Sequence, residues 1–400
     1  MTAALQCPQG WRVARFGDVV TCLNRTTRHP LADGLERVVG LDDMDSEGLP
    51  LERWHLLSDL SDGTSFTRTF REGQVLFGKR RAYQRKVSVP TFDGVCSGDI
   101  LVFEASGTEL LQTFLPYLVQ SDGFFDHALG TSAGSLSPRT KWQDLAKYEF
   151  TLPPLHQQRR IVEVLQCANA AVKALRTVAL QAELTLNLFA EAMVRWDEAF
   201  RCDLNYGAVE TKTLSDIAVL RRGRFSYRPR NEPRLYAPSG DHPFVQTGDI
   251  EKSTGRLDAF SQYLSDEGTR YSRAVEEGTL LITIAAVIGA VSRTTCRTYL
   301  PDSIVSVEPV KGESSTEFLE LALRGLRKHL ENSVATENTQ KNLSIEKLAA
   351  VRLPVPTLDI QQALVRRGKV LQSLLLGAQL HSSRALSLLT SLREALLKGA

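Results

Sequence analysis

The chain contains an internal repeat, which limits the folds open to it more than any other feature of its sequence. The stretch that begins at Trp142 resembles the stretch that begins at Ile345, and each contains a proline phrase followed by a glutamine. Five pairs share one offset of 203 residues (361 − 158): Trp142 with Ile345, Leu145 with Leu348, Pro153 with Pro356, Leu155 with Leu358 and Gln158 with Gln361. A fixed offset of this kind indicates two copies of one structural unit.

The similarity extends upstream of the prolines. FREGQVLFGKRR, which starts at Phe70, resembles VEEGTLLITIAA, which starts at Val275, with an offset of 205. DILVFE, ending at Glu104, resembles SIVSVE, ending at Glu308. Small changes of offset are what loop insertions produce. Chance similarity of two apolar stretches is the alternative, and we consider it the weaker one. A chain of 400 residues is also too long for one compact core, so we expect two modules.

Each repeat ends in a proline-free tail of about 45 residues with a helical pattern. In the first tail, steps of four and three residues meet only apolar side chains over five heptads, as in the seam of a coiled coil. The positions are Ile161, Leu165, Ala168, Val172, Leu175, Ala179, Ala182, Leu186, Phe189, Met193 and Trp196. The segment from Gln158 to Trp196 spans roughly 58 Å as a helix, which exceeds one turn of B-DNA, about 34–36 Å.

Adding 203 to each position carries the same frame into the second tail. It meets Leu364, Gly368, Leu371, Leu375, Ala378, Ser382, Ala385, Leu389, Leu392, Leu396 and Gly399. Glycine or serine weakens the seam at three of these positions. Two separate amphipathic helices, each packed on its own module, remain an alternative, but matched seams of equal length favour two helices that pack on one another. The expected domains are a module at 1–153, a spacer helix at 154–200, a second module at 201–356 and a second spacer helix at 357–400.

Short β-like runs, turn signals and helical patterns alternate within each module, which predicts an α+β fold. The expected strands are Gln74–Phe77, Lys86–Val89, Ile100–Phe103, Pro243–Gln246, Thr279–Ile284 and Ile304–Val307. The expected helices lie near Glu109–Gln120 and Glu317–Leu330. The most apolar run, Leu280 to Val291, is too short to span a bilayer and predicts a buried strand and its turn.

Positive charge is clustered, although the formal net charge is only +2. The first cluster, without any acid, contains Lys79, Arg80, Arg81, Tyr83, Arg85 and Lys86. The second, also without an acid, runs from Arg221 to Arg230 and contains Arg222, Arg224, Ser226, Tyr227, Arg228 and Arg230. One short basic run usually forms a solvated loop, whereas one in each module favours nucleic-acid binding. The clusters occupy different repeat positions, because the first falls opposite Ile284–Val291. The two modules could therefore share a fold and bind different sequences.

Several function classes find no support in the sequence. The six cysteines are scattered without zinc-ligand spacing, which suits a reducing cytosol, and the chain begins without a secretory signal pattern. There is no phosphate-binding loop, N-P-P or D-P-P tetrapeptide, H-E-x-x-H or G-x-S-x-G motif. The nearest nuclease-like pattern, Asp302 with Glu308, has its lysine at Lys311, one place too late, so Asp302 more simply shapes a turn before Ile304.

These features together resemble the specificity subunit of type I restriction-modification systems. The resemblance rests on the phrase from Phe150 to Ile161 and its second copy, on the module–helix–module–helix order, and on local phrases. These phrases run from Leu76 to Lys79, from Asp93 to Ser97, from Gly223 to Asn231, from Phe244 to Ile250 and from Thr339 to Leu343. The last phrase adds Gln340, Lys341 and Asn342 to the expected DNA-binding residues.

The resemblance implies two target recognition domains, each reading one half of a bipartite double-stranded DNA site. It implies that the two helices pack antiparallel with pseudo-two-fold symmetry and set the distance between half-sites. Two methyltransferase (modification) subunits would dock on this scaffold, and restriction–translocase subunits would join them in the cytoplasm, with no role for a membrane. S-adenosylmethionine, ATP and Mg²⁺ would be bound by those partners, and none by this chain, which would not be an enzyme. Two alternatives stay open: a DNA-processing enzyme such as a nuclease with an unrecognised active site, and a coiled-coil adaptor that binds only proteins.

Overall fold

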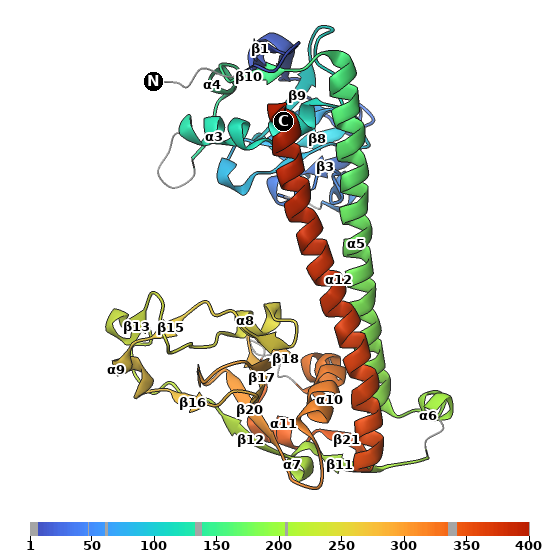
Figure 1. Ribbon diagram of the computed structural model, residues 1–400, viewed down its shortest axis with the longest axis vertical. Coiled ribbons are helices and arrows are strands. Elements are labelled where there is room, and N and C mark those ends of the chain that lie inside the picture. The colour runs from blue at the N-terminus through green and yellow to red at the C-terminus, as the bar shows by residue number, and fades with distance from the viewer. Residues whose placement is uncertain are drawn as a thin grey trace. The chain divides into compact units, whose positions relative to one another are not determined.

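The computed structural model describes residues 7–46, 48–60, 63–132, 138–204, 207–334 and 342–399. The chain forms two compact units, the first made of residues 1–174 and 383–400 and the second of residues 175–382. Two long helices, α5 (Leu155–Arg195) and α12 (Leu358–Lys398), belong to both units (Figure 1). Helix α5 begins in the first unit and ends in the second, whereas α12 begins in the second and ends in the first. The two helices therefore run in opposite directions.

The first unit mixes short strands and short helices. Its strands are β1 (Arg12–Arg15), β2 (Val20–Leu23), β3 (Arg37–Val39), β4 (His55–Leu56), β5 (Arg68–Phe70), β6 (Val75–Gly78), β7 (Val87–Ser88), β8 (Gly94–Cys96), β9 (Ile100–Ala105) and β10 (Glu149–Leu152). Its short helices are α1 (Phe16–Val19), η1 (Leu41–Asp43), η2 (Leu57–Asp59), η3 (Ala82–Gln84), α2 (Leu115–Val119), α3 (Asp122–Gly130) and α4 (Trp142–Leu145).

Two four-stranded sheets, in the orders β2-β9-β6-β7 and β4-β3-β8-β5, form the body of the first unit, and β1 pairs with β10 beside them. Aromatic residues fill the core under the first of these sheets. Phe16 is fully buried and packs edge-on against Phe103, and the Phe77 and Phe103 rings stack at 5.7 Å. Large apolar side chains are the usual source of stability in so small a module.

The second unit has a similar order of elements. Its strands are β11 (Glu210–Thr213), β12 (Ala218–Arg222), β13 (Tyr236–Ala237), β14 (Arg256–Leu257), β15 (Tyr263–Leu264), β16 (Arg273–Val275), β17 (Leu280–Ala285), β18 (Val287–Thr294), β19 (Thr298–Leu300), β20 (Ile304–Pro309) and β21 (Arg352–Val355). Its other helices are α6 (Glu198–Leu204), α7 (Leu214–Ile217), η4 (Pro233–Leu235), α8 (Thr247–Lys252), α9 (Asp266–Thr269), α10 (Thr316–His329), the π-turn η5 (Leu330–Val334) and α11 (Ile345–Ala349).

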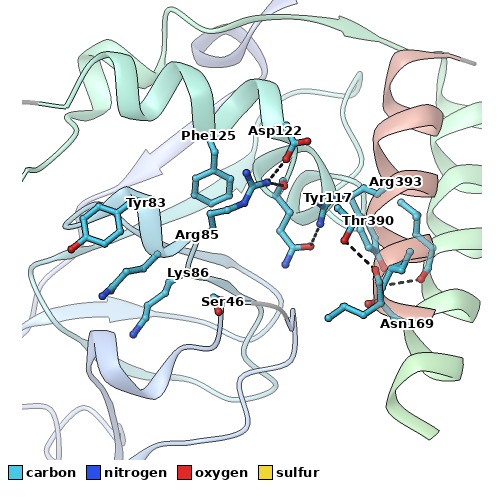
Figure 2. Close-up of a pocket in the computed structure, with 15 residues that line it drawn as sticks. Ser46, Tyr83, Arg85, Lys86, Tyr117, Asp122, Phe125, Asn169, Thr390 and Arg393 are labelled. Carbon is cyan, nitrogen blue, oxygen red and sulfur yellow. Dashed lines mark hydrogen bonds and ion pairs between the residues drawn. The ribbon is translucent and has the colours of Figure 1, made fainter. Parts of the chain in front are cut away.

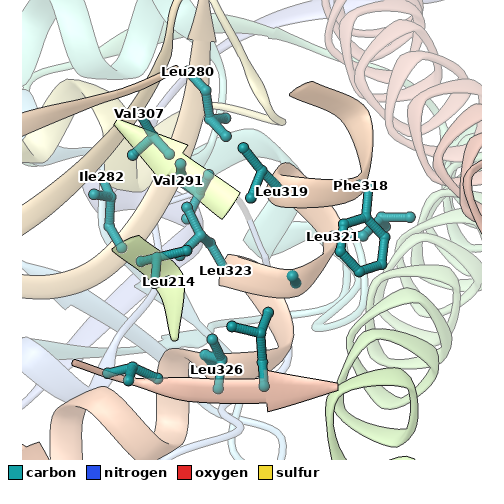
Figure 3. Packing of buried hydrophobic residues seen from close by; sticks show 14 of the residues in the cluster. Leu214, Leu280, Ile282, Val291, Val307, Phe318, Leu319, Leu321, Leu323 and Leu326 are labelled. Atoms are coloured by element: carbon teal, nitrogen blue, oxygen red, sulfur yellow. The ribbon is translucent and has the colours of Figure 1, made fainter. Parts of the chain in front are cut away.

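Helix α10 covers a five-stranded sheet of order β12-β20-β17-β18-β14. The Ser315 hydroxyl accepts the Phe318 N–H and caps the start of the helix, and three basic residues in the last turn suit the negative end of its dipole. Its apolar face is buried: Leu319 and Leu323 pack beside Leu280 and Val291 of the sheet (Figure 3). Burial of this face, rather than intrinsic helix propensity, fixes α10 in place.

Equivalent strand pairs in the two units support the repeat found in the sequence. In the first unit β1 and β10 are antiparallel, with Arg12 opposite Leu152, and in the second β11 and β21 are antiparallel, with Glu210 opposite Val355. In both units an α-helical turn follows, α1 or α7, and then a strand that pairs antiparallel with β9 or β20. The modules are therefore two copies of one topology in the part of the chain that carries these strands.

Ten of the apolar positions expected in the coiled-coil seam are withdrawn from solvent. Ile161, Leu165, Val172, Leu186, Leu364, Leu375 and Leu389 are buried, and Leu175, Leu371 and Leu392 are half-buried. Leu165 and Leu389 belong to one core with the first module, and Leu186 and Leu375 to one core with the second. Each core thus contains residues from both long helices. Two helices that each packed only on its own module would not produce such shared cores.

A buried glutamine near the start of each long helix ties that helix to its module. Gln158 is fully buried, and its amide donates to the carbonyls of Pro153 (2.8 Å) and Glu109 (2.7 Å) while its oxygen accepts the Leu111 N–H. Gln361, 203 residues later, donates to the carbonyls of Pro356 (3.0 Å) and Glu313 (2.7 Å). The repeated glutamine therefore satisfies backbone groups that burial would otherwise leave without partners.

We expect Gln158→Ala to lower the free energy of unfolding of the full chain by about 1.5 kcal/mol, because it leaves three backbone groups, one of them buried, without their partner. Gln361→Ala should cost less, since the Gln361 side-chain oxygen has no partner within the described residues. Denaturant midpoints measured beside the exposed neighbour variant Gln362→Ala check both values. A Gln158→Ala midpoint equal to that of Gln362→Ala would contradict the role assigned to this amide.

Two expected elements are wrong. The helix expected over Glu109–Gln120 is shorter and consists of α2 alone, because Pro116 stands in its first turn. The segment before it is held by the Gln112 side chain, which accepts the Ala105 N–H and donates to the Gly73 carbonyl. The strand expected over Pro243–Gln246 is reduced to isolated bridges before α8. The helix near Glu317–Leu330, the strand pair within Leu280–Val291 and the turn at Asp302 are confirmed.

Among the residues that the structure describes, no helix combines the length and the apolar character needed to cross a membrane.

Candidate nucleic-acid interface

The first basic cluster forms the connection between β6 and β7, where the second module has only a tight turn at Ala286 between β17 and β18. Arg81 and Arg85 both adopt left-handed backbone conformations on either side of η3. Arg81 is exposed and Tyr83 is 56% exposed. The loop therefore presents a cation and an aromatic ring to solvent, which are suitable groups for a phosphate or a base.

Arg85 and Lys86 of the same cluster are engaged inside the module. The Arg85 guanidinium donates to Asp122 (2.6 Å) and lies 4.5 Å above the centre of the Phe125 ring, as Figure 2 shows. Lys86 donates to the Leu41 carbonyl at 2.8 Å. Both side chains border a cavity of about 780 Å³, but their contacts hold the loop to its own module. Their part in DNA binding stays a prediction.

Lys79 and Arg80 lie in a second group of charges. Asp99 binds Arg80 at 3.3 Å and Arg139 at 2.9 Å, and although burial acts to raise its pKa, these two arginines hold the pKa below its ordinary value. Burial, together with Arg68, lowers the pKa of Lys79. Sequence reasoning missed Arg68 and Arg139, because they are distant in the chain from the cluster that they complete. Arg80, Arg81 and Asp99 border a cavity of about 690 Å³.

In the second module the structure brings three expected residues together. Arg222, Arg230 and Asn342 border one cavity of about 450 Å³, with Asp302 and Lys347. Asp302 organises the two arginines: its carboxylate binds Arg230 at 2.5 Å and its backbone carbonyl accepts from Arg222 at 2.6 Å. Asn342 forms an isolated bridge to Ala285. Gln340 and Lys341, which were expected beside Asn342, lie outside the described residues.

The remaining expected residues of the second cluster follow β12. Ser226 is exposed, and its hydroxyl donates to the Tyr271 carbonyl at 3.3 Å. The Tyr227 ring packs edge-on against Tyr271 at 4.9 Å. Arg228 donates to the carbonyls of Phe225 and Tyr227. These contacts rigidify the segment and leave Arg224 as its exposed cation without a partner in the part of the chain that the structure describes.

The two modules therefore present different arrangements of the same kinds of group. Guanidinium forks match phosphates and the major-groove edge of guanine, and asparagine matches adenine. In each module one acidic residue holds two arginines in place, Asp99 in the first and Asp302 in the second. Because these arginines are already ordered, they lose less conformational entropy on binding. No sequence pattern paired either acid with its arginines, because each acid lies far along the chain from at least one of the arginines that it holds. Such sites suit recognition of a polyanion.

Comparisons with known proteins agree with this picture. Residues 207–375 match a family model described as the type I restriction modification DNA specificity domain. The chain is 28% identical over 146 residues to the type I restriction enzyme EcoDI specificity subunit of Escherichia coli, a match that covers 36% of this chain and 32% of that relative. The match therefore spans about a third of that relative's length.

Two solved structures share the fold over nearly the whole chain. One, from a study of complex assembly and conformational transition of the type I R-M system, has a TM-score of 0.58 at 19% identity and covers 98% of this chain and 97% of its own. The type I restriction-modification system S subunit from M. genitalium has a TM-score of 0.55 at 14% identity, with 98% of each chain covered. At these identities the likeness concerns the fold.

Proposed function

We propose that this chain is the DNA-reading specificity subunit of a type I restriction-modification system, and its similarity to that family supports the proposal. Each module, a target recognition domain, contacts one half of a bipartite site in double-stranded DNA. The observation that carries the proposal is the presence of an arginine-bearing surface in each module: Arg80 and Arg81 border a cavity in the first, and Arg222 and Arg230 border one in the second.

The proposed division of the chain is a recognition domain at 1–153, a spacer helix at 154–200, a second recognition domain at 201–356 and a second spacer helix at 357–400. Each spacer contains a helix of 41 residues, or roughly 62 Å at 1.5 Å per residue. We expect this length to set the number of base pairs between the half-sites.

The spacer helices also carry an apolar surface that their own modules leave open. In the second unit Leu180, Leu184 and Leu188 recur at helical spacing on α5 and are 66%, 58% and 48% exposed, and Val370 and Leu374 on α12 are 61% and 60% exposed. Exposed apolar stripes of this kind mark protein contacts. We assign this surface to the methyltransferase subunits, two per chain, which would bind S-adenosylmethionine. Restriction–translocase subunits that use ATP and Mg²⁺ would join them at the DNA in the cytoplasm.

The chain itself contributes binding, and catalysis belongs to its partners. Exchange of residues 1–153 for the corresponding module of a relative with another specificity tests the proposal. We expect the exchange to change one half of the methylated site and leave the other half and the spacing intact. Metal-dependent cleavage by the isolated chain would favour the nuclease alternative, and binding to partners without any footprint on DNA would favour the adaptor alternative.

A further inference from the structure

The segments that follow β2 and β12 share a pattern that lies outside the repeated phrases described above. Arg25-Thr26-Thr27-Arg28-His29-Pro30 aligns with Arg224-Phe225-Ser226-Tyr227-Arg228-Pro229 at a single offset of 199 residues (224 − 25). The arginine, the hydroxyl residue two places later and the proline three places after that are common to both. The first segment lies outside both basic clusters.

Backbone hydrogen bonds place the two arginines at equivalent points of the fold. The Arg25 carbonyl accepts the Thr69 N–H at 2.9 Å, and the Arg224 carbonyl accepts the Arg273 N–H at 3.2 Å. Two residues later, the Thr27 N–H donates to Thr67 and the Ser226 N–H donates to Tyr271, at 2.8 and 3.0 Å. An isolated antiparallel bridge, Thr26 with Arg68 or Phe225 with Ser272, lies between these bonds in both modules.

The two side chains are also alike in what they lack. Arg25 and Arg224 are both exposed, and neither guanidinium has a hydrogen-bond or ion-pair partner within the ranges that the structure describes. In the second module Phe225 is 3% exposed, and because alternate residues of an extended chain face opposite ways, Arg224 points away from the core. Most arginines of the clusters are instead held by acids or carbonyls, as Arg85 is by Asp122 and Arg230 by Asp302.

A group that is repeated in both modules suits a feature that both half-sites share. The two halves of a bipartite site differ in their bases, whereas their phosphate backbones are the same. The cavity-lining residues differ between modules, as different base sequences require. We propose that Arg25 and Arg224 make the same phosphate contact at the two half-sites, and this inference rests on the proposed function. The contact sets the register of each module on the DNA, while the residues that differ between the modules read the bases.

The test measures DNA affinity at several salt concentrations, with the full chain assembled with its methyltransferase subunits. The DNA duplexes carry either the bipartite site or the same site with both halves scrambled. We expect Arg25→Ala and Arg224→Ala each to weaken binding to both duplexes by the same factor, about five- to tenfold, and to reduce the slope of log K against log salt by about 0.9. The double variant should reduce the slope by about 1.8. Arg→Lys at either position should keep the wild-type slope, since a phosphate contact needs the positive charge but not the two parallel N–H donors of a guanidinium.

Arg159→Ala and Lys311→Ala are matched controls. Arg159 is an exposed cation on α5, and Lys311 is an exposed cation that follows β20 at the end of the β12–β20 pair opposite to Arg224; both variants should leave the slope unchanged. An unchanged slope in either arginine variant, or a loss confined to the bipartite duplex, would overturn the shared phosphate contact. A wild-type complex that binds both duplexes equally would instead overturn the proposed function, so the two failures are distinguishable. Unfolding midpoints equal to the wild type exclude misfolding as the cause.

Discussion

Gly325→Ala is expected to lower the free energy of unfolding of the second unit by about 3 kcal/mol. Gly325 lies in α10, where it faces α5, and a Cβ atom at this position would stand 2.1 Å from the Ala190 carbonyl oxygen and 2.5 Å from its carbonyl carbon. A backbone carbonyl within a long helix cannot rotate away as a flexible side chain can. The added methyl group should therefore push α10 off α5 and open the core that contains Phe318 and Leu323.

Gly377→Ala is the matched control for this prediction. Gly377 also lies in a helix, α12, but nothing stands within 4 Å of the position its Cβ would occupy. Alanine there should stabilise the chain by about 0.5–1 kcal/mol, because it lowers the entropy cost of forming the helix. Thermal and denaturant unfolding of both variants should move the midpoints in opposite directions. Equal midpoints would show that the contact between α10 and α5 is looser than described.

Arg222→Ala is expected to weaken binding of the bipartite site by about 30-fold, or about 2 kcal/mol, and to relax specificity at one position of one half-site. Arg222 borders the same cavity as Arg230 and Asn342, and Asp302 fixes it through its backbone carbonyl. A guanidinium held in this way is pre-positioned for a bidentate contact, so its loss removes an interaction that needs little ordering. Competition binding against duplexes with single base changes measures both effects.

Its neighbour Arg221 provides the control. The two residues are adjacent in β12 and so point to opposite faces, and Arg221 reaches across to Glu308 on β20 at 3.1 Å. Arg221→Ala removes an exposed ion pair and should leave affinity within about twofold of the wild type. If both variants lose affinity by the same factor for every duplex, and the loss appears only as a smaller dependence of affinity on salt concentration, the cavity does not read bases.

The sequence was sufficient for the architecture because its signals are periodic and duplicated. The proline phrases and the heptad frame share one offset, and the seam positions, such as Leu165 and Leu364, are buried as that frame requires. The strand around Leu280 and the helix α10 followed from apolar runs of the right length. The helix expected from Glu109 failed because a single side chain, Gln112, holds that segment in a non-helical form.

The candidate interface was predictable only in outline. Sequence reasoning located the basic runs, but it could not tell which cations the fold neutralises, because their partners come from distant parts of the chain. Arg230 meets Asp302 across 72 residues, and Arg85 meets Asp122 across 37. Arg25 was missed because it stands outside any basic run, and the backbone hydrogen bonds that follow β2 and β12 equate it with Arg224.

The central claim is that this chain selects a two-part DNA site for methylation. Long-read detection of methylated adenines in the host genome, with and without this chain, tests it most directly. We predict a motif of two short specified parts separated by an unspecified spacer of fixed length, present in the wild type and absent after deletion. A motif that persists without the chain, or one that the chain's deletion removes but that is continuous rather than two-part, would contradict the account.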